Sequence, residues 1–150
     1  MKPLSGAELA WRDDCIARHD YSGSCFAYAR QFAQADTIVI AAPFWDGSFP
    51  ALLKIYIENI SVSGLTFRYT EKGIPQGLCR AKKLYYVTTA GGIIYNEAYG
   101  YGYIRDTVKS MFGVAETYFI KAENLDVFVE DTEKILADAR EGIDGLIRET

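Results

Sequence analysis

The sequence is poor in the residues that build several common kinds of site. Its one histidine, His19, stands in a polar stretch, and a single histidine is too few for most Ser-His-Asp triads and histidine-metal centres. We therefore expect His19 at the surface rather than in catalysis, and no metal site. The three cysteines, Cys15, Cys25 and Cys79, are irregularly spaced without a C-x-x-C pair, so we expect reduced thiols, with Cys79 as a small buried apolar residue.

Excess positive charge and long apolar runs are also missing. The chain has 16 Lys and Arg against 20 Asp and Glu, a net charge of −4, and no basic patch, which disfavours nucleic acid as a partner. Residues 1–10 lack the apolar core of a signal peptide, and no run reaches the ~18 apolar residues of a membrane helix. We therefore expect a cytoplasmic protein with no membrane contact. The 150 residues fit a single domain.

Three short apolar runs are predicted strands, because continuous runs rich in β-branched and aromatic residues suit parallel strands that are buried on both faces. These runs are residues 37–42, 84–89 and 117–122. The predicted helices are residues 6–17, 25–35, 51–62, 103–112 and 133–148, with a long excursion over residues 64–79. Strands that alternate with helices predict an α/β domain with an open parallel sheet and helices on both of its faces.

Local signals mark where several of these helices begin and end. Ser5 and Glu8 have the spacing of a capping box, and Gly113 stands where glycine favours a helix end. Pro50 suits a first helical turn, where its missing N–H costs nothing. We also expect Ser24 and either Asp131 or Thr132 to act as N-caps, and Ile135, Leu136, Ala139, Ile143 and Ile147 to face inward.

Two loops leave the carboxyl ends of predicted strands, where open α/β sheets bind their ligands. The tryptophan loop (residues 43–50) offers Phe44 and Trp45 followed by Gly47. The glycine loop (residues 88–92) offers two threonine hydroxyls and two glycines, at which backbone N–H groups can approach a flat ligand closely. An aromatic wall beside backbone donors suits an isoalloxazine ring, although the spacing alone does not establish a flavin site.

Several blocks, in order and at similar spacings, resemble the flavodoxin-like NAD(P)H quinone reductases and the FMN-dependent azoreductases. The blocks are residues 41–54, 64–70, 77–79, 82–83 and 88–92, and the resemblance runs from about Phe26 to the C-terminus. It implies a flavodoxin-like fold that binds FMN. It also implies ping-pong hydride transfer from NAD(P)H to a small aromatic acceptor, a quinone or an azo compound, and a homodimer.

The same resemblance implies the residues of the site. The residues expected to bind FMN are Pro43, Phe44, Trp45, Asp46, Gly47, Thr88, Thr89, Ala90, Gly91 and Gly92. Those of the tryptophan loop would contact the isoalloxazine mostly by backbone N–H groups and ring packing, and those of the glycine loop would hold its pyrimidine side. Tyr95 falls where family members place a tyrosine near the flavin, and it is the expected catalytic residue. It belongs to a group with Tyr99, Tyr101 and Tyr103 that suits a substrate wall and a dimer interface equally.

One departure from the family stands at the N-terminus. Family members begin with a strand, a serine-rich phosphate-binding loop, a helix and a second strand, and no such piece precedes the blocks quoted above. We therefore expect a flavodoxin-like domain that is shortened at its N-terminus, with residues 37–42 open on one side and with weak FMN binding. Two alternatives remain, a flavin-binding electron carrier without an NAD(P)H step and a non-catalytic family member that only self-associates.

Overall fold

A parallel sheet of three strands forms the centre of the structure, a computed structural model that describes residues 2–128 and 130–149. Its strands are β1 (Thr37–Ala41), β4 (Lys83–Thr89) and β5 (Glu116–Ala122), in the order β1-β4-β5. Thr37 aligns with Lys83, and Lys83 aligns with Glu116. The predicted strands and their parallel direction are confirmed to within one residue at each end. β1 stands at the edge of the sheet, as expected.

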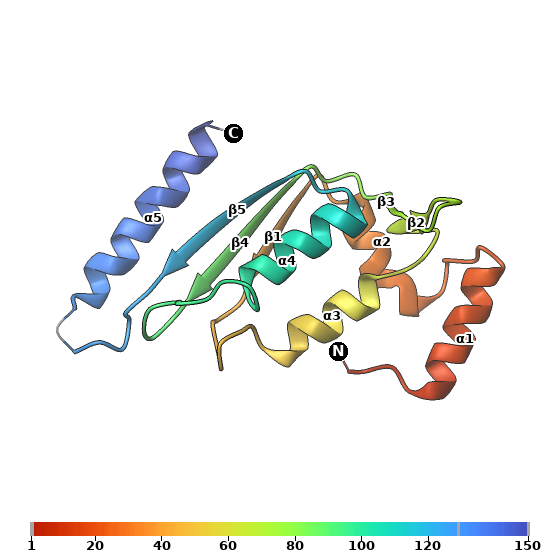
Figure 1. Cartoon of the computed structure of the whole chain (residues 1–150), viewed down its shortest axis with the longest axis horizontal. Coiled ribbons are helices and arrows are strands. Elements are labelled where there is room, and N and C mark those ends of the chain that lie inside the picture. The colour runs from red at the N-terminus through yellow and green to blue at the C-terminus, as the bar shows by residue number, and fades with distance from the viewer. Residues whose placement is uncertain (1, 129, 150) are drawn as a thin grey trace.

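Helices cover both faces of this sheet, as predicted (Figure 1). On one side lie α2 (Ala27–Gln34), α3 (Ala51–Ile60) and α4 (Tyr101–Thr107), which continues as a π-helical turn, η2 (Val108–Phe112). On the other side lies α5 (Thr132–Glu149), and α1 (Gly6–Ala17) stands at the far end of the molecule. A short 3-10 turn, η1 (Ser24–Phe26), leads into α2. None of the helices in the described residues is both long and apolar enough to cross a membrane.

Most of the predicted helix signals act as expected. Ser5 Oγ accepts the Glu8 N–H at 3.3 Å while the Glu8 carboxylate accepts the Ser5 N–H at 2.7 Å, so the capping box is confirmed. Gly113 ends η2 with φ +78°, the left-handed conformation that favours glycine. Of the two candidates before α5, Asp131 is the cap, since its carboxylate accepts the Lys134 N–H at 3.1 Å.

Three helix predictions need correction: the N-cap of α2, the start of α4 and the end of α3. Ser24 is not an N-cap, because it lies inside η1, the turn through which the chain enters α2. Gly23 caps η1 instead, and its carbonyl accepts the Phe26 N–H at 3.1 Å. α4 begins two residues earlier than predicted, at Tyr101, whose side chain is anchored in the interior. Ile147 faces the sheet as predicted, where it lines a hollow with Val39, but it stays 64% exposed because α5 covers β5 and leaves β1 bare on this face.

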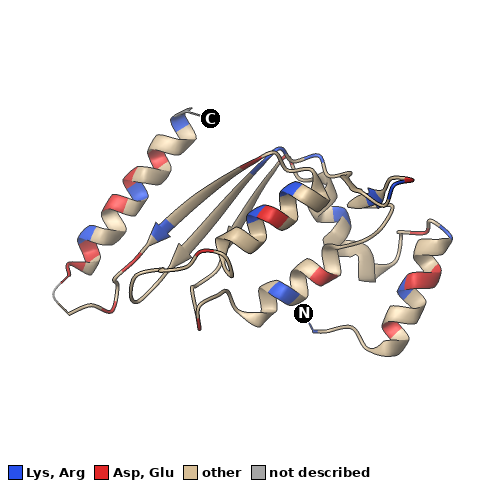
Figure 2. Cartoon of the chain, viewed as in Figure 1, with Lys and Arg blue, Asp and Glu red and all other residues tan. Residues whose placement is uncertain are grey.

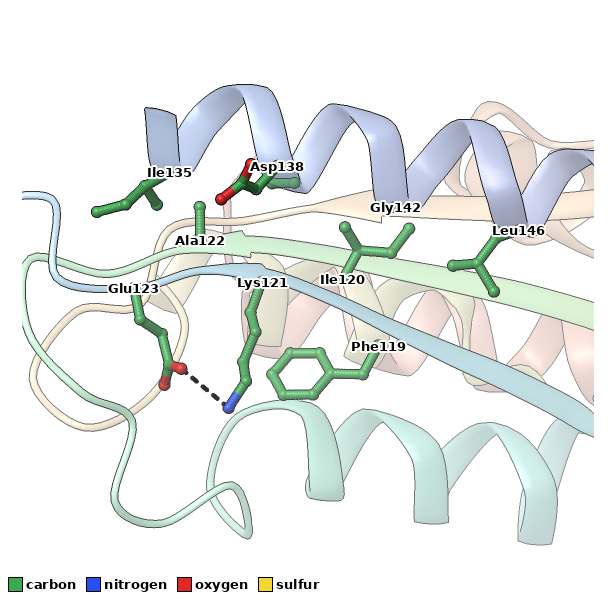
Figure 3. A pocket seen from close by; sticks show the side chains of 10 residues that line it. Phe119, Ile120, Lys121, Ala122, Glu123, Ile135, Asp138, Gly142 and Leu146 are labelled. Atoms are coloured by element: carbon green, nitrogen blue, oxygen red, sulfur yellow. Dashed lines mark ion pairs between the residues drawn. The ribbon is translucent and has the colours of Figure 1, made fainter. Parts of the chain in front are cut away.

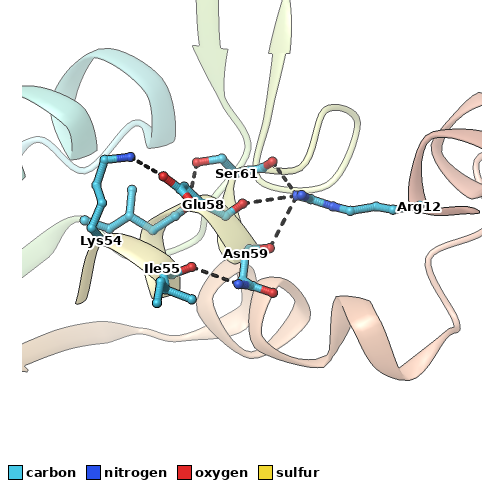
Figure 4. A network of polar contacts seen from close by, with 7 residues as sticks. Arg12, Lys54, Ile55, Glu58, Asn59 and Ser61 are labelled. Atoms are coloured by element: carbon cyan, nitrogen blue, oxygen red, sulfur yellow. Dashed lines mark hydrogen bonds and ion pairs between the residues drawn. The ribbon is translucent and has the colours of Figure 1, made fainter. Parts of the chain in front are cut away.

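α3 ends two residues before its predicted end because a buried arginine binds its last carbonyls (Figure 4). The Arg12 side chain reaches across from α1, and its Nη2 donates to the carbonyl oxygens of Glu58 at 3.3 Å and Ser61 at 2.7 Å. Asn59 offers a third carbonyl to the same nitrogen at 3.4 Å. These carbonyls lack partners within a helix, so a cation at this position satisfies them and joins α1 to α3.

The predicted excursion over residues 64–79 is an antiparallel hairpin of β2 (Phe67–Tyr69) and β3 (Pro75–Gly77). The hairpin packs on η2 so closely that a Cβ on Gly77 would overlap the backbone of Phe112 and Gly113. Cys79, just beyond the hairpin, is buried as predicted, and burial raises the pKa of its thiol to about 11. The hairpin therefore closes one end of the core between the sheet and its helices.

Candidate functional site at the carboxyl end of the sheet

The structure brings the tryptophan loop and the glycine loop together, because β1 and β4 are neighbouring parallel strands. The Phe44 N–H donates to the Thr89 carbonyl at 2.9 Å, directly beyond the last pair of the ladder. A hollow of about 250 Å³ opens between the two strand ends, and Pro43, Thr88 and Thr89 are among the residues that line it. The predicted position of the site, at the carboxyl ends of these strands, therefore coincides with a real hollow.

The tryptophan loop turns tightly through residues 45–48. Trp45 and Ser48 exchange two backbone hydrogen bonds of 2.8 Å, while Asp46 and Gly47 have φ values of +50° and +80°. This is the turn that a two-residue Asp-Gly loop favours. The N–H groups of Phe44 and Trp45 are thus already used within the chain, so of the expected backbone contacts only those of Asp46 and Gly47 remain. The Trp45 side chain is 61% exposed and presents a flat apolar surface to solvent.

The glycine loop contains one polar atom that lacks a partner. Thr88 is only 3% exposed, and its Oγ1 has no hydrogen-bond partner among the described residues. An unpaired buried hydroxyl is costly, so its presence next to a hollow fits a group that a ligand satisfies. Ala90 has a different place from the one expected, since it is buried and its N–H donates to the Ala122 carbonyl at 2.8 Å.

A segment that the sequence analysis did not single out lies over the glycine loop. Beyond β5, the Asp126 N–H donates to the Gly91 carbonyl at 3.0 Å, and the Leu125 N–H donates to the Ala90 carbonyl at 3.2 Å. The Asp126 carboxylate occupies the space that a Cβ on Gly91 would need. Gly92, by contrast, has open space where its Cβ would be. The position of the segment could have been inferred, because it follows the carboxyl end of the strand next to β4.

The predicted group of four tyrosines divides in two. The Tyr101 hydroxyl lies 2.9 Å from Thr117 Oγ1, its ring stacks on Phe119 at 4.4 Å between centroids, and Tyr103 packs against Phe49. Tyr95 and Tyr99 instead lie at the surface, and Tyr95 is 90% exposed. Ser48 Oγ donates to the Tyr99 carbonyl, which attaches this segment to the tryptophan loop. Two of the four tyrosines therefore pack against the core, and the other two are exposed.

A second hollow, of about 450 Å³, lies between β5 and α5 (Figure 3). Lys121 and Glu123 form an ion pair of 3.1 Å at its rim, and Glu123 also accepts the Ile94 N–H at 2.7 Å. The hydrogen bond from Ile94 attaches the start of the loop that carries Tyr95 to the end of β5. Within the described residues, no group of three His, Cys, Asp or Glu side chains is placed to hold a metal ion. His19 is exposed and lies far along the sequence from both loops.

An open parallel sheet with a hollow at the carboxyl ends of two neighbouring strands defines a doubly wound α/β ligand-binding domain. Residues 11–147 match the family described as having a flavodoxin-like fold, and the chain belongs to that family.

Two curated relatives are close in sequence. The chain is 48% identical over 119 residues to the FMN-dependent NADH:quinone oxidoreductase 2 of Clostridium acetobutylicum, a match that covers 76% of this chain and 58% of that protein. It is 44% identical over 129 residues to the FMN-dependent NADH:quinone oxidoreductase of Clostridium perfringens strain SM101, and this match covers 84% of this chain and 62% of that protein. The chain thus matches about three fifths of the length of these relatives.

Two solved structures share the fold. An azoreductase from Bacillus anthracis strain Sterne has a TM-score of 0.80 at 23% identity, covering 99% of this chain and 76% of its own. An FMN-dependent NADH-azoreductase from Bacillus anthracis strain Ames Ancestor, solved in complex with FMN, has a TM-score of 0.79 at 21% identity. This match covers 99% of this chain and 75% of that one. The expected flavodoxin-like fold is confirmed.

Proposed function

We propose that this chain carries the flavin-ring site of an FMN-dependent oxidoreductase that passes a hydride from NAD(P)H to a quinone-like or azo acceptor. The observation that carries the proposal is the meeting of the tryptophan loop and the glycine loop at one end of the sheet, where Pro43, Thr88 and Thr89 line a hollow, in a chain of flavodoxin-like fold. The names of the relatives, FMN-dependent NADH:quinone oxidoreductases at 44% to 48% identity, support the same activity.

The two loops offer groups that suit a flat, polar-edged ring. The Trp45 side chain offers an apolar face, while the N–H groups of Asp46 and Gly47 and the Thr88 hydroxyl are left for hydrogen bonds. Gly92 leaves room for a ring to approach the backbone. Bound FMN would supply the hydride chemistry, and the protein would supply orientation and hydrogen bonds.

Tyr95 is the residue that we propose to contact the acceptor. Its exposed ring stands on a loop that is held at one end by the hydrogen bond from the Ile94 N–H to Glu123 and farther along by the hydrogen bond from Ser48 of the tryptophan loop to the Tyr99 carbonyl. We also propose a homodimer in the cytoplasm, with the exposed aromatic residues Trp45 and Tyr99 as candidates for the contact between subunits. Light scattering at micromolar concentration tests the dimer.

Flavin titration tests the proposed site. We expect FMN and riboflavin to bind this chain with similar affinity, because every group assigned above contacts the ring and none contacts the phosphate. Charge-assisted phosphate contacts are worth about 1.5–3 kcal/mol each, so FMN binding more than about tenfold tighter than riboflavin would mean that phosphate-binding groups had been overlooked.

Variants test the residues and separate the activities. Trp45→Ala and Gly91→Val should weaken flavin binding, whereas His19→Ala, far from the hollow, should not. If both loop variants bind flavin as the wild type does, the site assignment is wrong. Anaerobic NAD(P)H oxidation with a quinone, in a protein that retains flavin, distinguishes the reductase from an electron carrier that has no NAD(P)H step.

A further inference from the structure

The sequence contains two Asp-Gly pairs, Asp46-Gly47 and Asp144-Gly145. In such a pair aspartate rearranges readily to isoaspartate, because glycine has no side chain to shield its backbone nitrogen. All four residues are exposed, and at neither glycine would a Cβ meet a further part of the chain within 4 Å. Sequence and access are therefore alike at the two pairs, and only the backbone around them differs.

The rearrangement exchanges bonds within the chain. The backbone nitrogen of the glycine attacks the aspartate Cγ, the N–Cγ bond forms and the Cγ–OH bond breaks, so the hydroxyl and the N–H proton leave as water. Water then adds to the main-chain carbonyl of the resulting succinimide and breaks its bond to the nitrogen. The main chain now runs through Cγ and is one methylene longer, at unchanged mass. The attack requires a nitrogen that is free to turn towards Cγ.

In the tryptophan loop the attacking nitrogen is free. The two hydrogen bonds of the turn join Trp45 and Ser48, so the Gly47 N–H takes part in neither. Within the described part of the chain, the Asp46 carboxylate has no hydrogen-bond or ion-pair partner either. Asp46 also has φ +50°, a conformation that residues with a side chain rarely adopt. The pair can therefore reach the attacking geometry at the cost of at most the two hydrogen bonds that close the turn.

The second pair is held inside a helix. α5 runs from Thr132 to Glu149, so helix continues on both sides of Asp144. In the helical pattern the Gly145 N–H donates to the carbonyl four residues earlier, and the attack would break that bond. It therefore requires local opening of α5, which is rare in an intact helix. Figure 2 shows the two settings, with acidic residues along α5 and at the tip of the loop between β1 and α3.

We propose that Asp46 is a site of covalent modification at which the native protein forms isoaspartate, while α5 protects Asp144 in the same dipeptide. The modification inserts a methylene into a turn that is closed by two hydrogen bonds of 2.8 Å. A two-residue turn cannot take up an additional backbone atom without changing its geometry. The effect on ligand binding rests on the proposed function: the N–H groups of Asp46 and Gly47, assigned above to the flavin ring, are displaced and flavin binding is weakened.

Isoaspartate mapping after incubation of the full chain at pH 6 and 37 °C tests the site. Trypsin releases the two pairs in separate peptides, residues 31–54 and 141–148, and chromatography with electron-transfer fragmentation distinguishes isoaspartate from aspartate in each. In the native protein we expect isoaspartate to accumulate at Asp46 at least about tenfold faster than at Asp144. In urea, where neither backbone is held, the two rates should agree within about threefold.

The variant Asp46→Glu is the matched control. It keeps a carboxylate in the turn but cannot form the five-membered ring, so the signal in residues 31–54 should disappear, although Asp36 remains in that peptide. Equal rates at Asp46 and Asp144 in the native protein, or isoaspartate at Asp46 in urea alone, would overturn the proposal. So would a signal that persists in Asp46→Glu.

Flavin separates this proposal from the proposed function. Riboflavin at ten times its Kd should slow the reaction at Asp46 about tenfold if the Gly47 N–H binds the ring, and should leave Asp144 unchanged. Protein that has formed isoaspartate should bind riboflavin less tightly and recover after repair with an isoaspartate methyltransferase and S-adenosylmethionine. Isoaspartate at Asp46 that riboflavin does not slow, with unchanged riboflavin affinity, would refute the assignment of the turn to the flavin and confirm the modification site.

Discussion

Replacing Gly77 by alanine should dislodge the β2–β3 hairpin from η2. A Cβ at this position would overlap the carbonyl carbon of Phe112 and the amide nitrogen of Gly113. Both are backbone atoms of a buried turn, and Phe112 is fully buried in the core. They cannot rotate aside as a flexible side chain can, so the hairpin itself must shift.

The cost can be bounded from known core substitutions. Inserting a methyl group into a packed interior costs about 1–3 kcal/mol, and a contact with backbone on both sides places Gly77→Ala at the upper end, about 3 kcal/mol. For a domain of this size each kcal/mol lowers the melting temperature by about 2–4 °C. We therefore expect a decrease of about 6–12 °C.

Thermal unfolding followed by circular dichroism measures this decrease, and urea unfolding gives the free energy independently. The matched control is Gly142→Ala in α5, where a Cβ meets no atom within 4 Å and alanine is the better helix former by about 1 kcal/mol. If Gly77→Ala melts within about 1 °C of the wild type, the hairpin does not depend on this close contact and the packing argument fails.

Three further predictions concern separate parts of the fold. Gly91→Ala should displace the Asp126 carboxylate and lower the free energy of unfolding, measured in urea, by about 1 kcal/mol. Adding Asp126→Ala to the same chain should remove this loss, and Gly92→Ala alone should cause none. The hydrogen bond from the Ser5 backbone N–H is the main cause that lowers the pKa of Glu8 to about 2. The ionised Glu8 carboxylate therefore stabilises the fold above pH 4.5, and this stabilisation is lost as the pH falls towards 2. Glu8→Gln should therefore flatten the pH dependence of unfolding in that window. Burial raises the pKa of Cys79 to about 11, so iodoacetamide at pH 8 should label this thiol slowly in the native protein and quickly in urea, and equal rates would contradict its burial.

The sequence predicts the sheet well because its signals are local. A continuous apolar run such as residues 37–42 is typical of a parallel strand that is buried on both faces of its sheet, and the runs at 84–89 and 117–122 are of the same kind. Helix ends were predicted correctly where a short-range contact decides them, as at Ser5 and Gly113. They were missed where a distant residue decides.

Arg12 illustrates the second case. It ends α3 by binding the Ser61 carbonyl, 49 residues along the chain, and no local pattern around either residue announces the contact. Tyr101 is similar, since its contact with Thr117 on β5 helps to place the start of α4. In both, tertiary packing overrides local propensity, which is the usual reason for errors of a few residues at helix ends.

The place of the candidate site was predictable for a geometric reason, and its donors were not. Two neighbouring parallel strands must end at the same edge, so the tryptophan loop and the glycine loop had to meet. Which N–H groups remain for a ligand depends on the turn between Trp45 and Ser48, and that turn uses the Trp45 N–H. The N–H groups of its two central residues, Asp46 and Gly47, take no part in the two hydrogen bonds of the turn, because these join Trp45 and Ser48. Of the residues of this loop expected to contact a ring, Asp46 and Gly47 therefore keep their backbone donors, while Trp45 can contribute only its side chain.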